Sequence, residues 1–136
     1  MAGAMSGLSF EEQSKWRNQI QNAILYGDYD CEYKPTFFNP VQYYNFEEPL
    51  KHKSEAEVMN FDLYNLRKAD LVIVNFNVAN SIGTAMELAI AKENRIPVIA
   101  LNKNNAELHP WIECCCDRIF DDMRDLVKYV VDFYLN

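Results

Sequence analysis

The segment Asp70–Asn75 is apolar at nearly every position. Such a run is typical of a strand that is covered on both faces, because a half-exposed strand alternates apolar and polar residues. A second run of this kind, Pro97–Leu101, follows it. Between the two lie a polar loop and a helix-like stretch that reaches Asn94. Strand, helix and strand in this order predict parallel neighbours that are joined by a crossover helix.

The same alternation continues over the rest of the chain. We expect further helices over Ser9–Tyr26, Ser54–Lys68 and Asp121–Tyr134, and further strands over Met1–Met5, Tyr33–Phe38 and Asp117–Phe120. The chain has 136 residues and no visible linker or repeat, so we expect one domain over residues 1–136. The predicted fold is α/β, a small doubly wound parallel sheet (flavodoxin- or Rossmann-like) with helices on both faces.

Charge and composition exclude several classes of function. The net charge is −7, which disfavours binding to nucleic-acid polymers or anionic membranes. No apolar run approaches about 18 residues, and no signal peptide is visible, so we expect a cytoplasmic protein without a membrane span. Cys31 and the consecutive Cys114–Cys116 fit neither a zinc site nor a disulfide framework, and we expect reduced thiols.

The most informative polar run, residues 79–87, lies between the first buried strand and the following helix. Loops in this position bind anions in α/β proteins, because backbone N–H groups and the helix dipole point at them. Ser81, Gly83 and Thr84 suit a single phosphate, and Glu87 is placed to face whatever the loop binds. Thr84 and Glu87 also have the spacing of a capping box, which leaves a purely structural interpretation open. No Walker loop or G-x-G-x-x-G is present, and we expect no metal and no cofactor.

Asp62 is a second carboxylate to consider. It lies four residues after Val58 and four before Leu66, so it borders the apolar stripe of its predicted helix. Partial burial there raises the pKa of a carboxyl group and favours a proton donor. A surface aspartate, or one that is bonded to nearby backbone, is the structural alternative.

Two stretches together resemble a known family. They are Asp62-Leu63-x-x-Leu66-x-x-Ala69-Asp70-Leu71-Val72-Ile73-Val74 and Ser81-x-Gly83-Thr84-x-x-Glu87-Leu88. Their residues and spacing resemble the nucleoside 2′-deoxyribosyltransferases, a family that includes the nucleoside 5′-monophosphate N-glycosidases. The segments Ala2–Gly7 and Ile96–Ile99 resemble that family's first strand with its loop and its next core strand, so the resemblance covers nearly the whole chain.

The resemblance implies an activity and a set of roles. Glu87 is the implied nucleophile, which forms a glycosyl ester, and Asp62 protonates the departing base or orients the substrate. Ser81 stands where family members that use free nucleosides usually have Asp, which favours a 5′-monophosphate. The alternative is that Ser81 is only an N-cap. Backbone groups near Ser6 and Gly7 would help to hold the phosphate, and Gly3 belongs to the same loop.

Other positions complete the expected site. Four segments should converge at the carboxyl ends of the strands, namely Gly3–Gly7, Asn39–Phe46, Asn75–Glu87 and Asn102–Trp111. We expect Asn77 among the substrate-binding residues. His109 lies where family members offer residues to a neighbouring subunit, although a structural role is the simpler alternative. By the same resemblance we expect a homodimer or a higher homo-oligomer.

The chain departs from the family in its first strand. Family members carry a tyrosine two residues before the Ala-Gly pair, and this chain begins at Met1, directly before Ala2 and Gly3. Either the first strand is cut short at its start, or another aromatic residue substitutes for the tyrosine, with Tyr43 and Tyr44 as the nearest candidates. Tyr43, Tyr44 and Phe46 either stack on the base or serve ordinary packing.

Two function classes therefore remain. The first is an enzyme that cleaves the N-glycosidic bond of a small-molecule nucleoside or nucleotide. The second is a nucleotide-binding protein that retains the fold without turnover, and a flavin carrier has little support from the loops. The sequence leaves open the sugar, the base and whether water or a second base accepts the glycosyl group.

Overall fold

The computed structural model describes residues 1–44 and 53–136. Its helices are α1 (Phe10–Tyr26), α2 (Glu55–Leu66), α3 (Ile82–Glu93), α4 (Pro110–Cys115) and α5 (Met123–Tyr134), with a short 3₁₀ helix, η1, at Pro40–Gln42. Its strands are β1 (Ala2–Gly3), β2 (Val72–Asn75), β3 (Val98–Leu101) and β4 (Arg118–Phe120). The strands form one sheet in the order β1-β2-β3-β4, and every pair is parallel.

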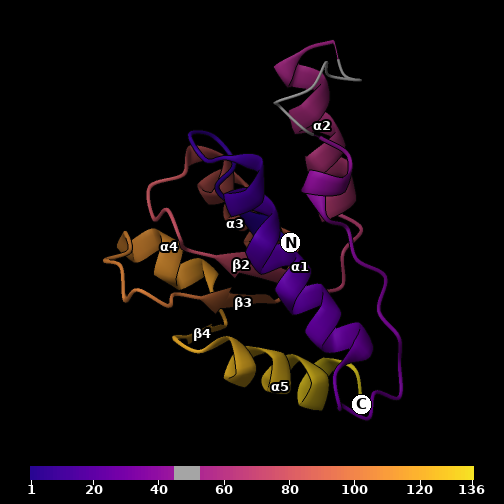
Figure 1. Cartoon of the computed structure of the whole chain (residues 1–136). Helices are drawn as coiled ribbons and strands as arrows, with labels where there is room; N and C mark the ends of the chain where they lie inside the picture. Colours follow the sequence, from indigo (N-terminus) through magenta and orange to yellow (C-terminus); the bar gives the residue numbers. More distant parts are fainter. Residues whose placement is uncertain (45–52) are drawn as a thin grey trace.

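Helices cover both faces of the sheet, as predicted. Successive side chains of a strand point to opposite faces, so the two faces are distinguished by residue parity. Val72, Val74, Val98 and Ala100 point to the face that is covered by α2, α3 and α4. Ile73, Ile99 and Leu101 point to the other face, and pack with apolar residues of α1 and α5. In Figure 1, α5 lies along one side of the sheet and α3 along the other.

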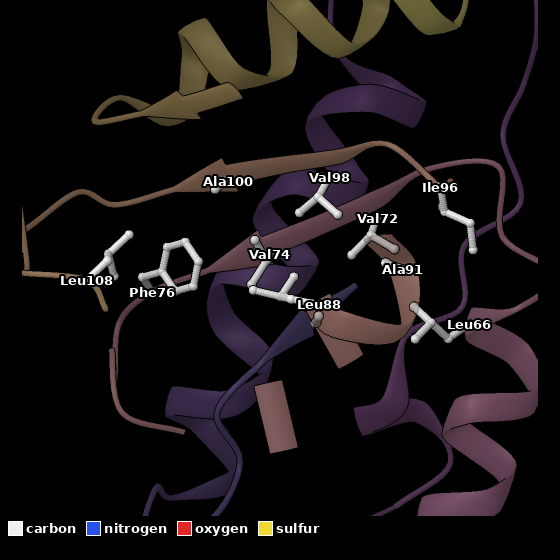
Figure 2. Close-up of a cluster of buried hydrophobic side chains, with 11 residues drawn as sticks. Leu66, Val72, Val74, Phe76, Leu88, Ala91, Ile96, Val98, Ala100 and Leu108 are labelled. Carbon is white, nitrogen blue, oxygen red and sulfur yellow. The ribbon is translucent and has the colours of Figure 1, made fainter. Parts of the chain in front are cut away.

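The core on the α3 side fixes how α3 is placed. Leu88 and Ala91 of α3 are fully buried against Val74 and Val98. Figure 2 shows these side chains meeting between the strands and the helix. Because Glu87 immediately precedes Leu88, the packing of Leu88 determines where the Glu87 carboxylate lies.

One predicted strand, Tyr33–Phe38, is wrong. Among the described residues, no sheet pairing includes this segment, although the amino group of Met1 donates to the Phe38 carbonyl at 2.9 Å and so brings its end beside β1. The described β1 has two residues, which pair with Val74 and Asn75. A strand this short offers too few backbone groups for a second ladder.

The start of α3 also differs from the prediction. The helix begins at Ile82, with Ser81 as its N-cap, so Gly83, Thr84 and Glu87 are helical rather than part of a loop. Thr84 and Glu87 therefore do not form a capping box. By contrast, the predicted capping box of Ser9 and Glu12 is confirmed at the start of α1.

A short helix, α4, was not predicted. It follows the polar loop after β3, and it contains Cys114 and Cys115. The cysteines of the described residues are free thiols. No helix within residues 1–44 and 53–136 combines the length and apolar character needed to cross a bilayer.

Candidate active site

The predicted site residues Glu87, Asp62 and Tyr43 line one cavity of about 700 Å³. The cavity follows the β1 edge of the sheet, past Met1 and Ile73, instead of lying only at the carboxyl ends of the strands as we predicted. The short β1 explains the difference, because it pairs with only the last two residues of β2 and leaves the earlier part of that strand uncovered.

Glu87 is a half-buried carboxyl group in the second turn of α3. Its pKa is raised to about 7, mainly by burial and then by the neighbouring Asp62 carboxylate. The Met1 amino group and the Arg17 guanidinium oppose this effect. Glu87 therefore changes its charge near neutral pH, as expected of a reactive carboxyl group in a cleft.

Asp62 lies in α2 and is hydrogen-bonded by a buried tyrosine. The Tyr44 hydroxyl donates to Asp62 Oδ1 at 3.0 Å, and the Val58 carbonyl lies 3.4 Å from the same hydroxyl. Burial and the Asp62 charge raise the pKa of Tyr44, so this tyrosine remains a donor. A hydrogen bond of this kind favours the ionised form of Asp62.

An aromatic cluster lies beside these carboxylates. Phe38 and Tyr43 stack with ring centroids 5.2 Å apart, and both line the cavity. Phe61 of α2 packs edge-on against both rings, at 5.7 and 5.6 Å. Tyr43 is 45% exposed, so its ring is the part of the cluster that a ligand can reach from solvent. The predicted contribution of Phe46 lies outside the described residues.

The side chains of Ser81 and Thr84 are hydrogen-bonded to each other. The Ser81 hydroxyl accepts from the Thr84 backbone N–H at 3.3 Å and from the Thr84 hydroxyl at 2.9 Å. Ser81 is therefore the N-cap of α3, and its predicted contact with a phosphate remains a prediction. A hydroxyl that accepts twice still has its own proton to donate. Neither residue lines the cavity, and a Cβ added at Gly83 would meet no neighbouring atom within 4 Å outside its own helix backbone.

Two glycines with special conformations lie at the end of β1 and in the loop that follows it. Gly3 has a φ of 150°, and an added Cβ would lie 2.9 Å from the Trp16 ring and 3.2 Å from the Asn75 carbonyl. Gly7 has a φ of 77° and, like Ser6, is exposed. These values explain both glycines by backbone geometry and close packing. The three residues do not line the cavity.

Asn77 and His109 have local partners instead of a place in the cavity. Asn77 is exposed, and its side-chain oxygen accepts from the Val78 N–H at 3.2 Å. His109 is exposed and caps α4, with Nδ1 accepting from the Trp111 N–H at 3.2 Å. Neither residue lines the cavity. His109 has the structural role of a helix cap, and the substrate contacts expected of both residues remain predictions.

Sequence reasoning missed Arg17. This side chain is fully buried in α1, and burial lowers its pKa to about 10 against the opposing effect of Glu87 and Asp62. A signal was present, because Arg17 lies three and seven residues before Ile20 and Ile24 on the apolar side of α1. A charged residue on an apolar stripe calls for an explanation.

The arrangement brings two carboxylates and an aromatic surface to one cavity. Such a site suits chemistry that builds positive charge on a substrate carbon, because a carboxylate stabilises that charge or bonds to the carbon. Among the described residues, no group of three or more His, Cys, Asp and Glu side chains is placed to hold a metal ion.

Comparison with known proteins adds no relative. No family model, no curated protein and no solved structure matches the chain.

Proposed function

We propose that this chain cleaves the N-glycosidic bond of a nucleoside 5′-monophosphate through a glycosyl-enzyme intermediate, as a relative of the nucleoside 2′-deoxyribosyltransferases. One observation carries the proposal. Glu87 of α3 and Asp62 of α2, the two acidic residues in the family-like pattern, line the same cavity beside stacked aromatic rings.

Glu87 acts as the nucleophile. One carboxylate oxygen bonds to C1′ while the C1′–N bond breaks, and the electron pair of that bond leaves with the base, which takes up a proton from water. Water, or a second base that restores an N-glycosidic bond, then attacks C1′ of the ester. The C1′–O bond breaks, the attacking group loses a proton to solvent, and the Glu87 carboxylate is regenerated. The carboxylate form is required, so the pKa of about 7 places the active form at neutral to alkaline pH.

Asp62 orients the substrate and keeps its negative charge near the reacting carbon. The Tyr44 hydrogen bond supports this role over proton donation, since it stabilises the carboxylate. Tyr44 thereby fills part of the role that we expected of a substitute tyrosine. Tyr43, stacked on Phe38, is placed to cover the face of the base.

The choice of a monophosphate rests on Ser81 and on the loop after β1, neither of which lines the cavity. The Ser81 hydroxyl retains a proton for a phosphate oxygen and carries no charge that would repel one. It stands at the N-terminus of the 12-residue α3, where the helix dipole favours an anion.

A chromatographic screen tests the proposal. Nucleoside monophosphates and free nucleosides are incubated with the protein, with and without adenine, and released or exchanged bases are measured. We expect base release from a monophosphate, and loss of that release in Glu87→Ala with nucleotide binding retained. If the wild-type protein releases no base from any substrate but binds nucleotides, the non-catalytic binder is the correct function.

We also propose a homo-oligomer, on the strength of exposed apolar side chains near the start of α3. Ile82 is 79% exposed, Trp111 of the adjacent α4 is 80% exposed, and Met86 one turn beyond Ile82 is also exposed. Apolar surface of this kind suits an interface. Sedimentation velocity should show a dimer or larger species, and Ile82→Glu should shift it toward the monomer.

A further inference from the structure

Gln13 and Arg17 hold the loop that follows β1. Gln13 Nε2 donates to the carbonyls of Met5 and Leu8, both at 2.9 Å. Arg17 Nη2 donates to the carbonyl of Gly3 at 2.9 Å. The two residues lie one turn apart on α1, so a single helix face binds three carbonyl oxygens of the loop over residues 3–8.

Keeping these side chains in place costs stability. Arg17 is 0% exposed, and Gln13 is 4% exposed. Arg17 Nη1 donates to the Gln13 carbonyl at 2.6 Å, but Arg17 Nε and Gln13 Oε1 are buried without a hydrogen-bond partner among the described residues. A buried guanidinium is expensive to desolvate, and an apolar residue would pack here at lower cost. The pair is therefore better explained by what it does to the loop than by the stability of α1.

The carbonyl contacts determine where the N–H groups of the loop point. A trans peptide is planar, so its N–H points opposite to its carbonyl. The Met5 carbonyl faces Gln13, which directs the N–H of exposed Ser6 away from α1. Gly7, with a φ of 77°, then turns the chain back. The Ser6 N–H therefore points outward, while the carbonyl oxygens of the loop are held toward α1. This arrangement suits an anion.

We propose that Gln13 and Arg17 are positioning residues that hold the residue 3–8 loop in the form whose Ser6 N–H receives the 5′-phosphate of the substrate. This inference rests on the proposed function, because it assigns the phosphate contact of the same substrate. The buried charge of Arg17 adds attraction for a phosphate dianion that a neutral residue would lack.

Kinetics on paired substrates test the inference. Gln13→Met removes the donor to Met5 and Leu8 with little change in volume, and Gln19→Met, on the exposed side of the same helix, is the matched control. We expect Gln13→Met to raise KM for a nucleoside monophosphate about tenfold, with kcat and the KM for the free nucleoside within about twofold of wild type. Gln19→Met should change none of these values.

Variants of Arg17 distinguish a specific effect on phosphate binding from a general loss of structure. Arg17→Lys keeps a charge and a donor near the Gly3 carbonyl, and should retain most of the preference for the monophosphate, whereas Arg17→Met should lose it. A merely structural role would instead lower activity on both substrates by the same factor. Equal effects of Gln13→Met on the monophosphate and the free nucleoside would overturn the inference and leave the proposed function standing.

A titration that needs no turnover provides an independent readout. Adding inorganic phosphate to the ¹⁵N-labelled wild-type protein should shift the amide resonances of Ser6 and Gly7 in a saturable manner. The same titration of Gln13→Met should give a dissociation constant about tenfold weaker. The absence of any shift at Ser6 in the wild-type protein rejects the phosphate contact even if the protein cleaves nucleosides.

Discussion

Two regions of this molecule use polar side chains in opposite ways. At the starts of α3 and α4, Ser81, Thr84 and His109 are bonded to each other or to the first backbone N–H groups of their own helices. Glu87, which lines the cavity, and Arg17 of α1 are charged groups whose pKa values are displaced by burial. The polar groups of the first region satisfy their own helix ends, whereas burial acts against the charged forms of Glu87 and Arg17 in the second.

The difference separates structural from functional polar groups. A cap contributes about 1 kcal/mol to its helix, and that contribution explains its presence. A carboxyl group whose pKa is raised by burial and by a second carboxylate, as that of Glu87 is, opposes folding at neutral pH, so its presence needs another reason. Among the residues selected from the sequence, only those of the second kind line the cavity, together with Tyr43.

The largest expected effect comes from removing one of the paired charges. Asp62→Asn should lower kcat/KM by about 100-fold, because the carboxylate near the reacting carbon is lost. It should also move the acidic limb of the pH profile below pH 7, because the Asp62 charge helps to raise the pKa of Glu87. The measurement is kcat/KM for a nucleoside monophosphate between pH 5 and 9.

Asp70→Asn is the control for this change, since Asp70 lines the same cavity at an exposed position. It should leave both the rate and the pH profile nearly unchanged. If the acidic limb of the pH profile stays in place in Asp62→Asn, the two carboxylates do not interact. The cavity would then differ from the helix-capping regions for a reason other than electrostatics.

Burial of the Glu87 carboxyl group should lower the free energy of unfolding at neutral pH. The pKa of Glu87 rises from 4.5 to about 7 on folding, so the native state holds the proton over a pH range in which the unfolded state has released it. Wild-type stability therefore falls as the pH rises from about 4.5 to above 7. Glu87→Gln removes this dependence, and we expect it to be about 1–3 kcal/mol more stable than wild type at pH 8 and nearly equal at pH 4.

Urea unfolding of wild type and Glu87→Gln at several pH values measures this difference. Glu93→Gln, at the exposed end of the same helix, should show almost no pH-dependent difference from wild type. If Glu87→Gln is less stable than wild type at pH 8, the ionised Glu87 side chain stabilises the fold, as the helix-capping residues do.

The sequence predicted the central strands well and the edge of the sheet poorly. β2 and β3 are apolar on both faces, and that pattern has few alternatives in a short α/β chain. Tyr33–Phe38 has a strand-like composition, but pairing depends on a neighbour, and the described β1 offers only two residues. α4 has six residues, which is too short to show a helical period.

The site shows the same limit. Glu87, Asp62 and Tyr43 were identified from residue type and spacing, and they line the cavity. Ser81 and Thr84 are both good N-cap residues in the correct spacing, so local sequence alone did not determine where α3 begins. Arg17 was missed because its partners, the Gly3 carbonyl and the cavity carboxylates, are distant in the sequence.

A smaller effect should follow from two changes at Ser81. Ser81→Ala removes the cap of α3 and should cost about 1 kcal/mol, seen as a fall in Tm of several degrees. Ser81→Asp restores a good cap and should recover that stability, but its charge should raise KM for the monophosphate and not for the free nucleoside. If Ser81→Asp leaves KM for the monophosphate unchanged, Ser81 is a cap without a role in binding.

The smallest effect on stability and activity is expected at His109, which caps a helix and lies outside the cavity. Its ring accepts one hydrogen bond at the start of a six-residue helix and does not line the cavity. His109→Asn supplies another capping side chain and should change stability by only a few tenths of a kcal/mol and activity by less than twofold. A large loss of activity with unchanged stability would place His109 in the site of a neighbouring subunit. That result should then depend on protein concentration, because dilution would separate the subunits and lower wild-type activity in the same way.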